Sequence, residues 1–314
     1  MGLTIGVDIG GTKVAAGLVD EQGGIVASAR RDTPSNDPAK IEMLIADVVR
    51  ELQASHDVDA VGIGAAGFVD AARATVVFAP NLAWRDEPLR RNLEERCGLP
   101  VVVENDANAA AWAEARFGAG RGQQYLVVLT VGTGLGGGLV IGGELYRGRL
   151  GIAAEFGHVT VEPGGRRCGC GARGCWERYA SGRALILEAQ ELATVSPAIA
   201  GRLLELAGGQ PEAITGLDVT RAAQDGDEAA LEAFRVIGTW LGQGMAALSA
   251  ILDPGMFVLG GGVSAAGELL REPAERSLHE RITARAYREV PGVRLAELGP
   301  GAGIVGAADL ARRR

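Results

Sequence analysis

The sequence predicts an α/β protein built from two lobes, and three observations support this. At 314 residues the chain exceeds the size at which a single hydrophobic core usually stops growing. Short apolar runs rich in β-branched residues alternate with segments of helical periodicity, as in folds with helices packed on sheets. A strand, a glycine turn and a second strand near the start recur about 122 residues later, which indicates two lobes of one plan.

The first lobe opens with three predicted strands. Leu3–Ile9 ends at a glycine pair, Val14–Val19 follows at once, and Ile25–Ala29 comes after a turn at Asp20–Gly24. Such short connections predict an antiparallel meander.

Strands and helices then alternate through the rest of the first lobe. Strands are expected at Val58–Ala65 and Val101–Val103, with a helix between about Asp86 and Arg96. An earlier helix is indicated by apolar residues at helical spacing, namely Ile41, Leu44, Ile45, Val48, Val49 and Leu52.

The second lobe repeats the opening pattern and then becomes mainly helical. Leu126–Val131 and Leu139–Ile141 are predicted strands around a glycine turn. A long helix is expected at Glu228–Leu252, where Asp253-Pro254-Gly255 ends it, and the strand Met256–Leu259 follows. A short helix after Gly301-Ala302-Gly303 closes the chain. We therefore expect a small lobe of residues 1–107 plus 300–314 and a large lobe of residues 108–299.

Composition and charge exclude several classes of protein. The chain is 47% hydrophobic and 22% charged with 48 glycines, which fits a soluble α/β protein and neither disorder nor collagen. A net charge of -8 argues against a broad surface for nucleic acid or anionic lipid. Asp8 interrupts the first apolar run too early for a secretory signal. We expect a cytoplasmic protein without nucleic-acid or membrane partners.

Two glycine turns have the composition of phosphate-binding loops. The first combines an acid at a strand end, two glycines, a hydroxyl and a cation, in Asp8, Gly10, Gly11, Thr12 and Lys13. Its spacing is neither that of a P-loop nor that of a dinucleotide-binding turn, and an ordinary hairpin turn is the alternative. The second turn contains Thr133 and Gly134 at the matching place in the repeat. Two matched turns favour phosphate binding.

The two turns resemble the phosphate motifs of the actin, hexokinase and Hsp70 superfamily, which has a ribonuclease H-like fold. More narrowly, the chain resembles the ROK family of sugar kinases and sugar-responsive repressors. The resemblance runs from Leu3 nearly to the end, and Gly261 and Gly262 in the run Gly260–Gly262 resemble the adenosine motif. It implies a two-lobed fold with mixed sheets and a cleft between the lobes for ATP.

An acid that could serve as a catalytic base follows the strand Val101–Val103. Taken alone, Asp106 in the run Glu104–Ala110 would be the N-cap of the helix that begins there. Phosphoryl transfer, however, needs a group that orients the acceptor hydroxyl and takes its proton. The ROK resemblance implies this role for Asp106, and it implies that Asn105 binds a sugar hydroxyl.

Three cysteines and a histidine have the composition of a structural zinc site. Cys168, Cys170 and Cys175 lie within eight positions of one another, and His158 is just upstream. Three thiolates and an imidazole suit a closed tetrahedral site, although C-x-C is tighter than the usual spacing. Reduced thiols at turns are the alternative, and the ROK resemblance favours zinc. Cys97 lies apart and is expected to be a packed thiol.

The resemblance also implies the remaining contacts with a sugar. Gly67, Glu155, His158 and Glu177 match family positions that contact it, with zinc holding one nitrogen of His158 and leaving the other free. The stretch Ala79–Trp84 resembles the loop that closes over the sugar, with Asn81 as its contact.

Together these features predict transfer of the γ-phosphoryl group of ATP to the 6-hydroxyl of a hexose. Glucose is the expected acceptor, which gives glucose 6-phosphate and ADP and places the reaction in glycolysis. Asp8 is expected to bind Mg²⁺ through water, and a homo-oligomer, dimer or tetramer, is expected. The alternatives are another ROK kinase acting on fructose, mannose or an N-acetylhexosamine, or polyphosphate as donor. A sugar-sensing regulator is disfavoured, since only seven residues precede Asp8, too few for a helix-turn-helix.

Overall fold

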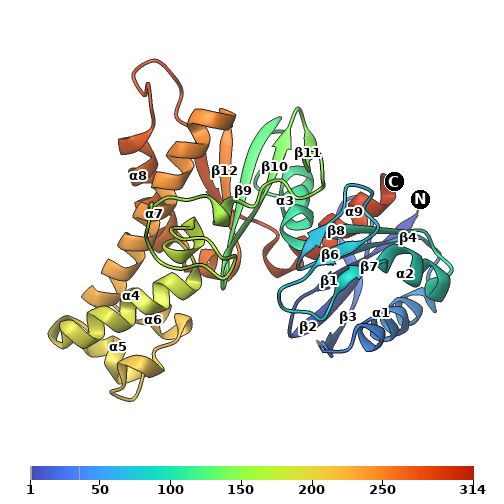
Figure 1. Ribbon diagram of the computed structural model, residues 1–314, viewed down its shortest axis with the longest axis horizontal. Coiled ribbons are helices and arrows are strands. Elements are labelled where there is room, and N and C mark those ends of the chain that lie inside the picture. Colours follow the sequence, from blue (N-terminus) through green and yellow to red (C-terminus); the bar gives the residue numbers. More distant parts are fainter. Residues whose placement is uncertain (1, 35) are drawn as a thin grey trace. The chain divides into compact units, whose positions relative to one another are not determined.

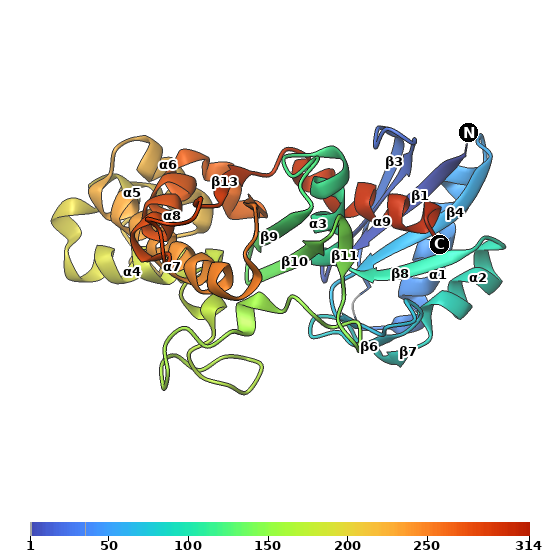
Figure 2. The same ribbon diagram turned by 90° about the horizontal axis from the view of Figure 1, so that it is seen from above.

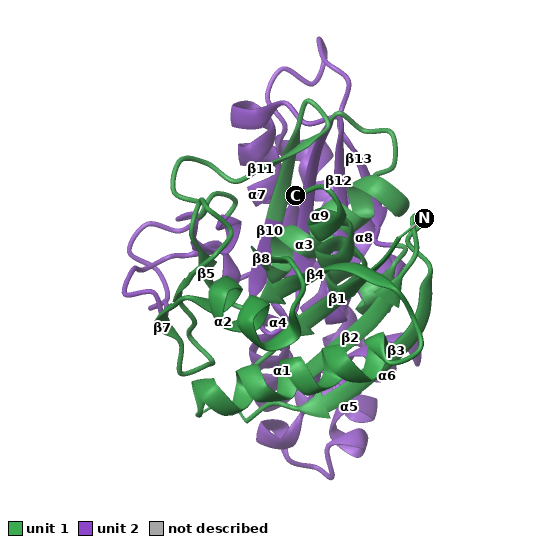
Figure 3. Cartoon of the chain, turned by 90° about the vertical axis from the view of Figure 1, so that its right-hand side faces the viewer, with its two compact units in different colours: residues 1–124, 138–154, 297–314 green, residues 125–137, 155–296 purple. Residues whose placement is uncertain are grey.

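The computed structural model describes residues 2–34 and 36–314, which form two compact units (Figure 3). Unit 1 comprises residues 1–124, 138–154 and 297–314, and unit 2 comprises residues 125–137 and 155–296. These units do not test the lobe boundaries expected from the sequence, which stay a prediction.

Unit 1 is built on a five-stranded mixed sheet (Figure 1). Its strands, in the order β3-β2-β1-β4-β8, are β3 (Ile25–Asp32), β2 (Lys13–Val19), β1 (Leu3–Ile9), β4 (Val58–Ala65) and β8 (Val101–Asn105). The pairs β1–β2 and β2–β3 are antiparallel, which confirms the predicted meander. The pairs β1–β4 and β4–β8 are parallel, so the carboxyl ends of β1, β4 and β8 meet at one edge.

Helices cover both faces of this sheet (Figure 2). On one face the apolar residues of α1 (Pro38–Gln53) join a buried cluster with Ile5, Val7 and Ile9 of β1. On the other face lie α9 (Ala302–Arg312) and α3 (Asp106–Phe117). A Cβ atom added at Gly6 would lie 1.9 Å from the Ile304 carbonyl oxygen. This glycine therefore lets α9 rest directly on the sheet.

The connection between β4 and β8 differs from the prediction. It contains a small antiparallel sheet of β5 (Phe68–Val69), β6 (Val76–Phe78) and β7 (Arg85–Glu87), which the sequence did not reveal. The helix expected from Asp86 is α2 (Leu89–Cys97). Pro88 explains the later start, because the residue before a proline is disfavoured in helical conformation.

A second sheet repeats the plan of the first. Its strands, in the order β11-β10-β9-β12-β13, are β11 (Glu144–Tyr146), β10 (Leu135–Ile141), β9 (Tyr125–Val131), β12 (Met256–Gly260) and β13 (Gly292–Leu295). The strands β9 and β10 are displaced from β1 and β2 by 122 residues each. The parallel pair β9–β12 corresponds to β1–β4. The internal repeat predicted from the sequence is thereby confirmed.

Apart from β9, β12, β13 and the start of β10, unit 2 is mainly helical. Its helices are α4 (Gly182–Val195), α5 (Gly201–Leu206), α6 (Gly216–Gln224), α7 (Glu228–Leu252) and α8 (Glu268–Arg281). The bounds of α7 are those predicted, and Asp227 caps its start by accepting a hydrogen bond from the backbone N–H of Ala230. The short 3₁₀ turns of unit 2 are η1 (Phe156–His158), η2 (Trp176–Arg178), η3 (Pro197–Ile199), η4 (Pro211–Ala213) and η5 (Gly262–Ala266), whereas η6 (Gly299–Gly301) lies in unit 1 before α9. Among residues 2–34 and 36–314, no helix has both the length and the apolar character to cross a membrane.

Candidate active site

The carboxyl edge of the first sheet gathers several of the predicted site residues. Because β1, β4 and β8 are parallel, Ile9 pairs with Ala65 and Ala65 with Asn105. The turn after Ile9, the residue Gly67 and the start of α3 at Asp106 therefore emerge at the same edge. Crevices at the carboxyl ends of parallel strands are the usual ligand sites of α/β sheets.

Asp106 is the first residue of α3 and not its N-cap. Asn105 is the N-cap of α3, and its Oδ1 accepts a hydrogen bond of 3.0 Å from the backbone N–H of Asn108. The Nδ2 of Asn105 donates to Oδ1 of Asp106 at 3.1 Å. The alternative that Asp106 is only an N-cap is therefore wrong, and its carboxylate is held in place by its neighbour.

Two carboxyl groups at this edge have raised pKa values. Burial raises the pKa of Asp106 to about 6, although backbone N–H groups of the first helical turn and the Asn105 amide oppose the shift. Burial, and secondly the negative charge of Asp106, raise the pKa of Asp8 to about 7. Both acids thus titrate near neutral pH, which is the range that general acid–base catalysis requires.

The first glycine turn is exposed and braced from one side. The backbone N–H of Gly10 donates to the Lys13 carbonyl at 2.9 Å, and the Thr33 hydroxyl donates to the Gly10 carbonyl at 2.9 Å. Gly11, Thr12 and Lys13 are at the surface of unit 1 or close to it, with the side chain of Thr12 exposed. This partial exposure agrees with the phosphate interpretation.

The loop predicted to close over a sugar lies beside this turn. A Cβ atom added at Gly11 would lie 3.1 Å from the Cβ atom of Asn81. The guanidinium of Arg85 donates to the carbonyls of three loop residues, Ala79, Leu82 and Trp84. Arg85 therefore fixes the backbone around Asn81, a role that the sequence did not reveal.

Gly67 is in contact with the same group of residues. The Nδ2 of Asn105 donates to the Gly67 carbonyl at 3.1 Å. A Cβ atom at Gly67 would lie 2.4 Å from the Phe78 carbonyl oxygen, so the backbone of β6 occupies the place of a side chain. Unit 1 therefore brings Asp8, Gly10, Gly67, Asn105 and Asp106 to one sheet edge.

Unit 2 brings the second glycine turn and the late glycine run together. The strands β9 and β12 are parallel neighbours, with Thr130 paired to Gly260, so the turn around Thr133 and Gly134 and the run at Gly261 and Gly262 follow at one edge. Gly261 has φ +84, and a Cβ atom there would lie 2.6 Å from the Val131 carbonyl oxygen. Only glycine fits this position, which keeps the two segments in contact.

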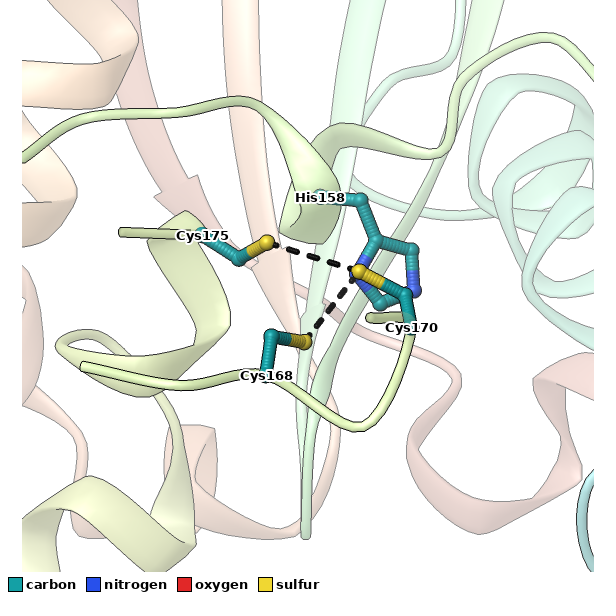
Figure 4. Close-up of side chains that lie close together, drawn as sticks. All are labelled: His158, Cys168, Cys170 and Cys175. Atoms are coloured by element: carbon teal, nitrogen blue, oxygen red, sulfur yellow. Dashed lines mark hydrogen bonds between the residues drawn. The ribbon is translucent and has the colours of Figure 1, made fainter. Parts of the chain in front are cut away.

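Four predicted metal ligands form one cluster (Figure 4). The ligand atoms of His158, Cys168, Cys170 and Cys175 all lie within 4.8 Å of one another. Nδ1 of His158 is 3.7 Å from Sγ of Cys168, and Sγ of Cys170 is 3.6 Å from Sγ of Cys175. Zn–S bonds of about 2.3 Å and Zn–N bonds of about 2.0 Å at tetrahedral angles give separations of about 3.8 Å between sulfurs and about 3.5 Å from sulfur to nitrogen. The cluster therefore fits a tetrahedral Zn²⁺ ion.

The backbone around the cluster is ordered by short bridges. Thr160 pairs with Cys175 and Arg167 with Arg173 in isolated antiparallel bridges. The backbone N–H of Ala172 lowers the pKa of the Cys170 thiol, whereas burial raises the pKa of the other two thiols. Cys97 lies in unit 1, half-buried against the core of that unit, as the prediction of a packed thiol expects.

The predicted sugar ligands of unit 2 surround this cluster. The Cys168 thiol donates to Oε1 of Glu177 at 3.0 Å. A Cβ atom added at Gly134 would lie 2.8 Å from Oε2 of the same Glu177, so this glutamate lies near both the cluster and the second glycine turn. Glu155 precedes η1, and its carbonyl accepts a hydrogen bond from the backbone N–H of His158 at 3.1 Å. Since Nδ1 of His158 faces the thiols, Nε2 is the nitrogen left for a substrate.

Comparison with known proteins decides the family. The ROK family model matches residues 4–314, which is nearly the whole chain. The chain belongs to the ROK family. The ROK resemblance, which rested on the two glycine turns and the late glycine run, is therefore confirmed.

Individual relatives match over nearly their full length. A glucokinase of Streptomyces coelicolor is 50% identical over 312 residues, covering 99% of this chain and 98% of the relative. A glucokinase of Thermotoga maritima is 38% identical, covering 99% of this chain and 97% of the relative. The crystal structure of a ROK family glucokinase from Streptomyces griseus, in complex with glucose and AMPPNP, is 52% identical with a TM-score of 0.91 and full coverage of both chains. The predicted actin/hexokinase-like fold is confirmed.

One polar cluster of this ROK protein was not predicted at all. Glu104, Arg73 and Arg147 are joined by ion pairs inside unit 1. Glu104 stands in the same run as Asp106, but nothing in the sequence relates either arginine to it. Only the fold brings these three side chains together.

Proposed function

We propose that this ROK protein is a glucokinase, which transfers the γ-phosphoryl group of ATP to the 6-hydroxyl of glucose. The observation that carries the proposal is full-length similarity, at 50% and 52% identity, to glucokinases, one of them crystallised with glucose and AMPPNP. The products are glucose 6-phosphate and ADP. We place the reaction in the cytoplasm, at the entry of glucose into glycolysis.

Asp106 is the catalytic base in this proposal. Its pKa of about 6 leaves most of the carboxylate ionised at neutral pH, so it can accept the proton of the 6-hydroxyl. As that proton leaves, the hydroxyl oxygen forms a bond with the γ-phosphorus and the bond from the γ-phosphorus to the bridging oxygen of ADP breaks. The proton then passes from Asp106 to solvent. Asn105 keeps the carboxylate oriented through its hydrogen bond of 3.1 Å.

The sugar contacts in this proposal are those that the ROK resemblance implies. Hydroxyl groups of glucose require several donors and acceptors in fixed positions, because each unpaired polar group costs affinity. The proposed contacts are the polar or backbone groups of Gly67, Asn81, Asn105, Glu155, His158 and Glu177. Their support is the sequence resemblance together with their clustering within each unit.

The nucleotide is held through exposed glycine backbone. We assign the phosphates to Gly10, Gly11, Thr12, Lys13, Thr133 and Gly134, and the adenosine to Gly261 and Gly262. Asp8 would hold Mg²⁺ through water, and the dication would favour the ionised carboxylate and so lower the pKa that burial raises. The cation would neutralise charge on the β- and γ-phosphates.

The cysteine cluster is a structural zinc site in this proposal. His158, Cys168, Cys170 and Cys175 supply four protein ligands, which leaves no open position for a reacting group. The metal would fix the ring of His158 so that Nε2 meets a sugar hydroxyl.

A coupled assay tests the proposed function. ATP and polyphosphate are each combined with glucose, mannose, fructose and N-acetylglucosamine, and ADP or sugar phosphate is measured. Glucose with ATP should give the highest kcat/KM, with mannose weaker and N-acetylglucosamine weaker still. A preference for fructose or an N-acetylated sugar would make the chain another hexose kinase, and a preference for polyphosphate would change the donor. Absence of turnover with every pair would favour a sugar-sensing regulator. Sedimentation of the same sample would test the proposed dimer or tetramer.

A further inference from the structure

A buried carboxylate joins the end of β8 to the start of α3. Glu104 has only 1% of its side chain exposed. Its Oε1 accepts a hydrogen bond of 3.0 Å from the backbone N–H of Asn105 and one of 3.1 Å from Nδ2 of Asn108. Asn108 belongs to the first turn of α3, whose first residue is Asp106. The carboxylate of Glu104 therefore fixes the chain on both sides of Asp106.

The other oxygen of Glu104 faces two cations. Nε of Arg147 lies 2.7 Å from Oε2 of Glu104 and Nε of Arg73 lies 3.3 Å from it, in ion pairs without the alignment of hydrogen bonds. The guanidinium of Arg147 also donates to the carbonyls of Asp70, at 2.9 Å, and Ala71, at 3.1 Å. One buried carboxylate thus links the loop after β5 and the segment after β11 to the edge of the sheet. Because the carboxylate is buried, its removal would leave both guanidinium groups without their counter-charge.

The backbone of Arg73 shows that this arrangement is maintained against strain. Arg73 has φ +56, a conformation that side-chain-bearing residues rarely adopt. Its carbonyl accepts a hydrogen bond of 3.1 Å from the backbone N–H of Val103, in β8. Strained backbone conformations persist only where several surrounding contacts hold them in place, and they are concentrated at functional sites.

We propose that Glu104 is a positioning residue, which orients the Asp106 carboxylate through Asn105 and is itself held by its arginine partners. The last link is the amide of Asn105, whose Nδ2 donates both to Asp106 and to the Gly67 carbonyl. Glu104 accepts the backbone N–H of Asn105 and so sets where this amide lies. The inference rests on the proposed function, since it assumes that Asp106 is the base.

The substitution Glu104→Gln tests the proposal while keeping the shape of the side chain. The amide of the new glutamine side chain can still accept a hydrogen bond through its oxygen. Arg147, however, then faces either the amide N–H groups or a neutral oxygen where the wild-type protein has a negative charge. Misplacement of a reacting group by about 1 Å can lower the rate about 100-fold, so we expect kcat for glucose to fall between about 10-fold and 100-fold. The KM for ATP should stay within about twofold of the wild-type value, because the hydrogen bonds and ion pairs described for Glu104 join it to Asn105, Asn108, Arg73 and Arg147, which are not among the proposed phosphate contacts.

Glu114, in the helix α3 that follows Glu104, provides a matched control. Like Glu104 it is a buried glutamate, 1% exposed, and it accepts hydrogen bonds from the backbone N–H groups of Ala119, Glu297 and Leu298 at the far end of α3. Glu114→Gln should lower the melting temperature, yet kcat should stay within about twofold of wild type when both variants are assayed fully folded. Equal loss of kcat in Glu104→Gln and Glu114→Gln would assign the effect to stability and overturn the proposal.

Variants of Arg147 keep the test decisive if Glu104→Gln fails to fold. Arg147→Lys retains the charge but loses the planar group that reaches Glu104 and two carbonyls, so kcat should fall at least about threefold. Adding Arg147→Met to a folded Glu104→Gln should lower kcat less than Arg147→Met does in wild type. Wild-type kcat in Arg147→Lys, or additive losses in the double variant, would refute the positioning role. If instead the wild-type protein phosphorylates no sugar, the proposed function itself fails.

Discussion

The raised pKa of Asp106 leads to a quantitative prediction for the pH dependence of sugar phosphorylation. The base works as the carboxylate, so activity is present above its pKa and is lost as the pH falls through that value. With a pKa of about 6, about 90% of Asp106 is ionised at pH 7 and about 10% at pH 5. An acid with the ordinary pKa of 3.8 would still be more than about 90% ionised at pH 5.

The assay is kcat/KM for glucose at saturating ATP between pH 5 and pH 8.5, because this ratio reports ionisation of the free enzyme. We expect an acid limb with a midpoint near pH 6 and a loss of about tenfold between pH 7 and pH 5. The charges of Asp8 and Asp106 interact, so the acid limb of the profile reports the ionisation of both carboxyl groups together. In Asp8→Asn, the pH dependence of the remaining activity should fit a single ionisation.

A flat profile down to pH 5 would refute this reasoning, because it would require an unperturbed acid or a different base. An acid limb that persists unchanged in the residual activity of Asp106→Asn would also contradict it. Stability must be followed in parallel by circular dichroism, so that a loss of folded protein is not counted as a loss of ionisation.

Three further predictions concern the metal, the second turn and Asp8. Cys170→Ser should release about one zinc ion per chain, and it should raise the KM for glucose because the ring of His158 is no longer held by the metal. If elemental analysis finds no zinc in the wild-type protein, the zinc assignment is wrong. Gly134→Ala should raise the KM for ATP, because a Cβ atom at Gly134 would meet the Glu177 side chain. Gly132→Ala should leave it unchanged, because a Cβ atom there would have no neighbour within 4 Å. Equal effects of the two substitutions would make the turn an ordinary hairpin. The pKa of Asp8 is raised in the folded protein, so its contribution to the free energy of unfolding falls as the pH rises from 3.8 to about 7. Asp8→Asn should therefore raise the melting temperature more at pH 8 than at pH 4.5. An equal change in melting temperature at the two pH values would argue against the raised pKa.

Much of the framework could be predicted because it depends on local pattern. The meander of β1, β2 and β3, the 122-residue repeat and the bounds of α7 follow from apolar periodicity and turn residues. The cysteine cluster could be predicted from ligand type and spacing, and the structure brings its four ligand atoms together. The roles of Asp106, Asn105 and the sugar contacts came from family resemblance and remain predictions at the level of individual residues.

Other features could not be read from the sequence because they depend on tertiary contacts. The strands β5, β6 and β7 have only two or three residues each, too few to show a period. The N-cap of α3 is Asn105 and not Asp106, a difference of one residue that only the hydrogen bond to Asn108 reveals. The ion pairs of Glu104 join segments that are separate in the chain, and Arg85 acts on carbonyls that carry no sequence signal.

Turnover of glucose and ATP by Asp106→Asn is the measurement that tests the central claim most directly. The substitution keeps the size of the side chain and removes the proton acceptor, so kcat should fall by about 100-fold or more while the KM for glucose changes little. Single-turnover measurement of glucose 6-phosphate should show the same loss in the chemical step. A variant that turns over glucose at near wild-type kcat would contradict the assignment of Asp106 as the catalytic base.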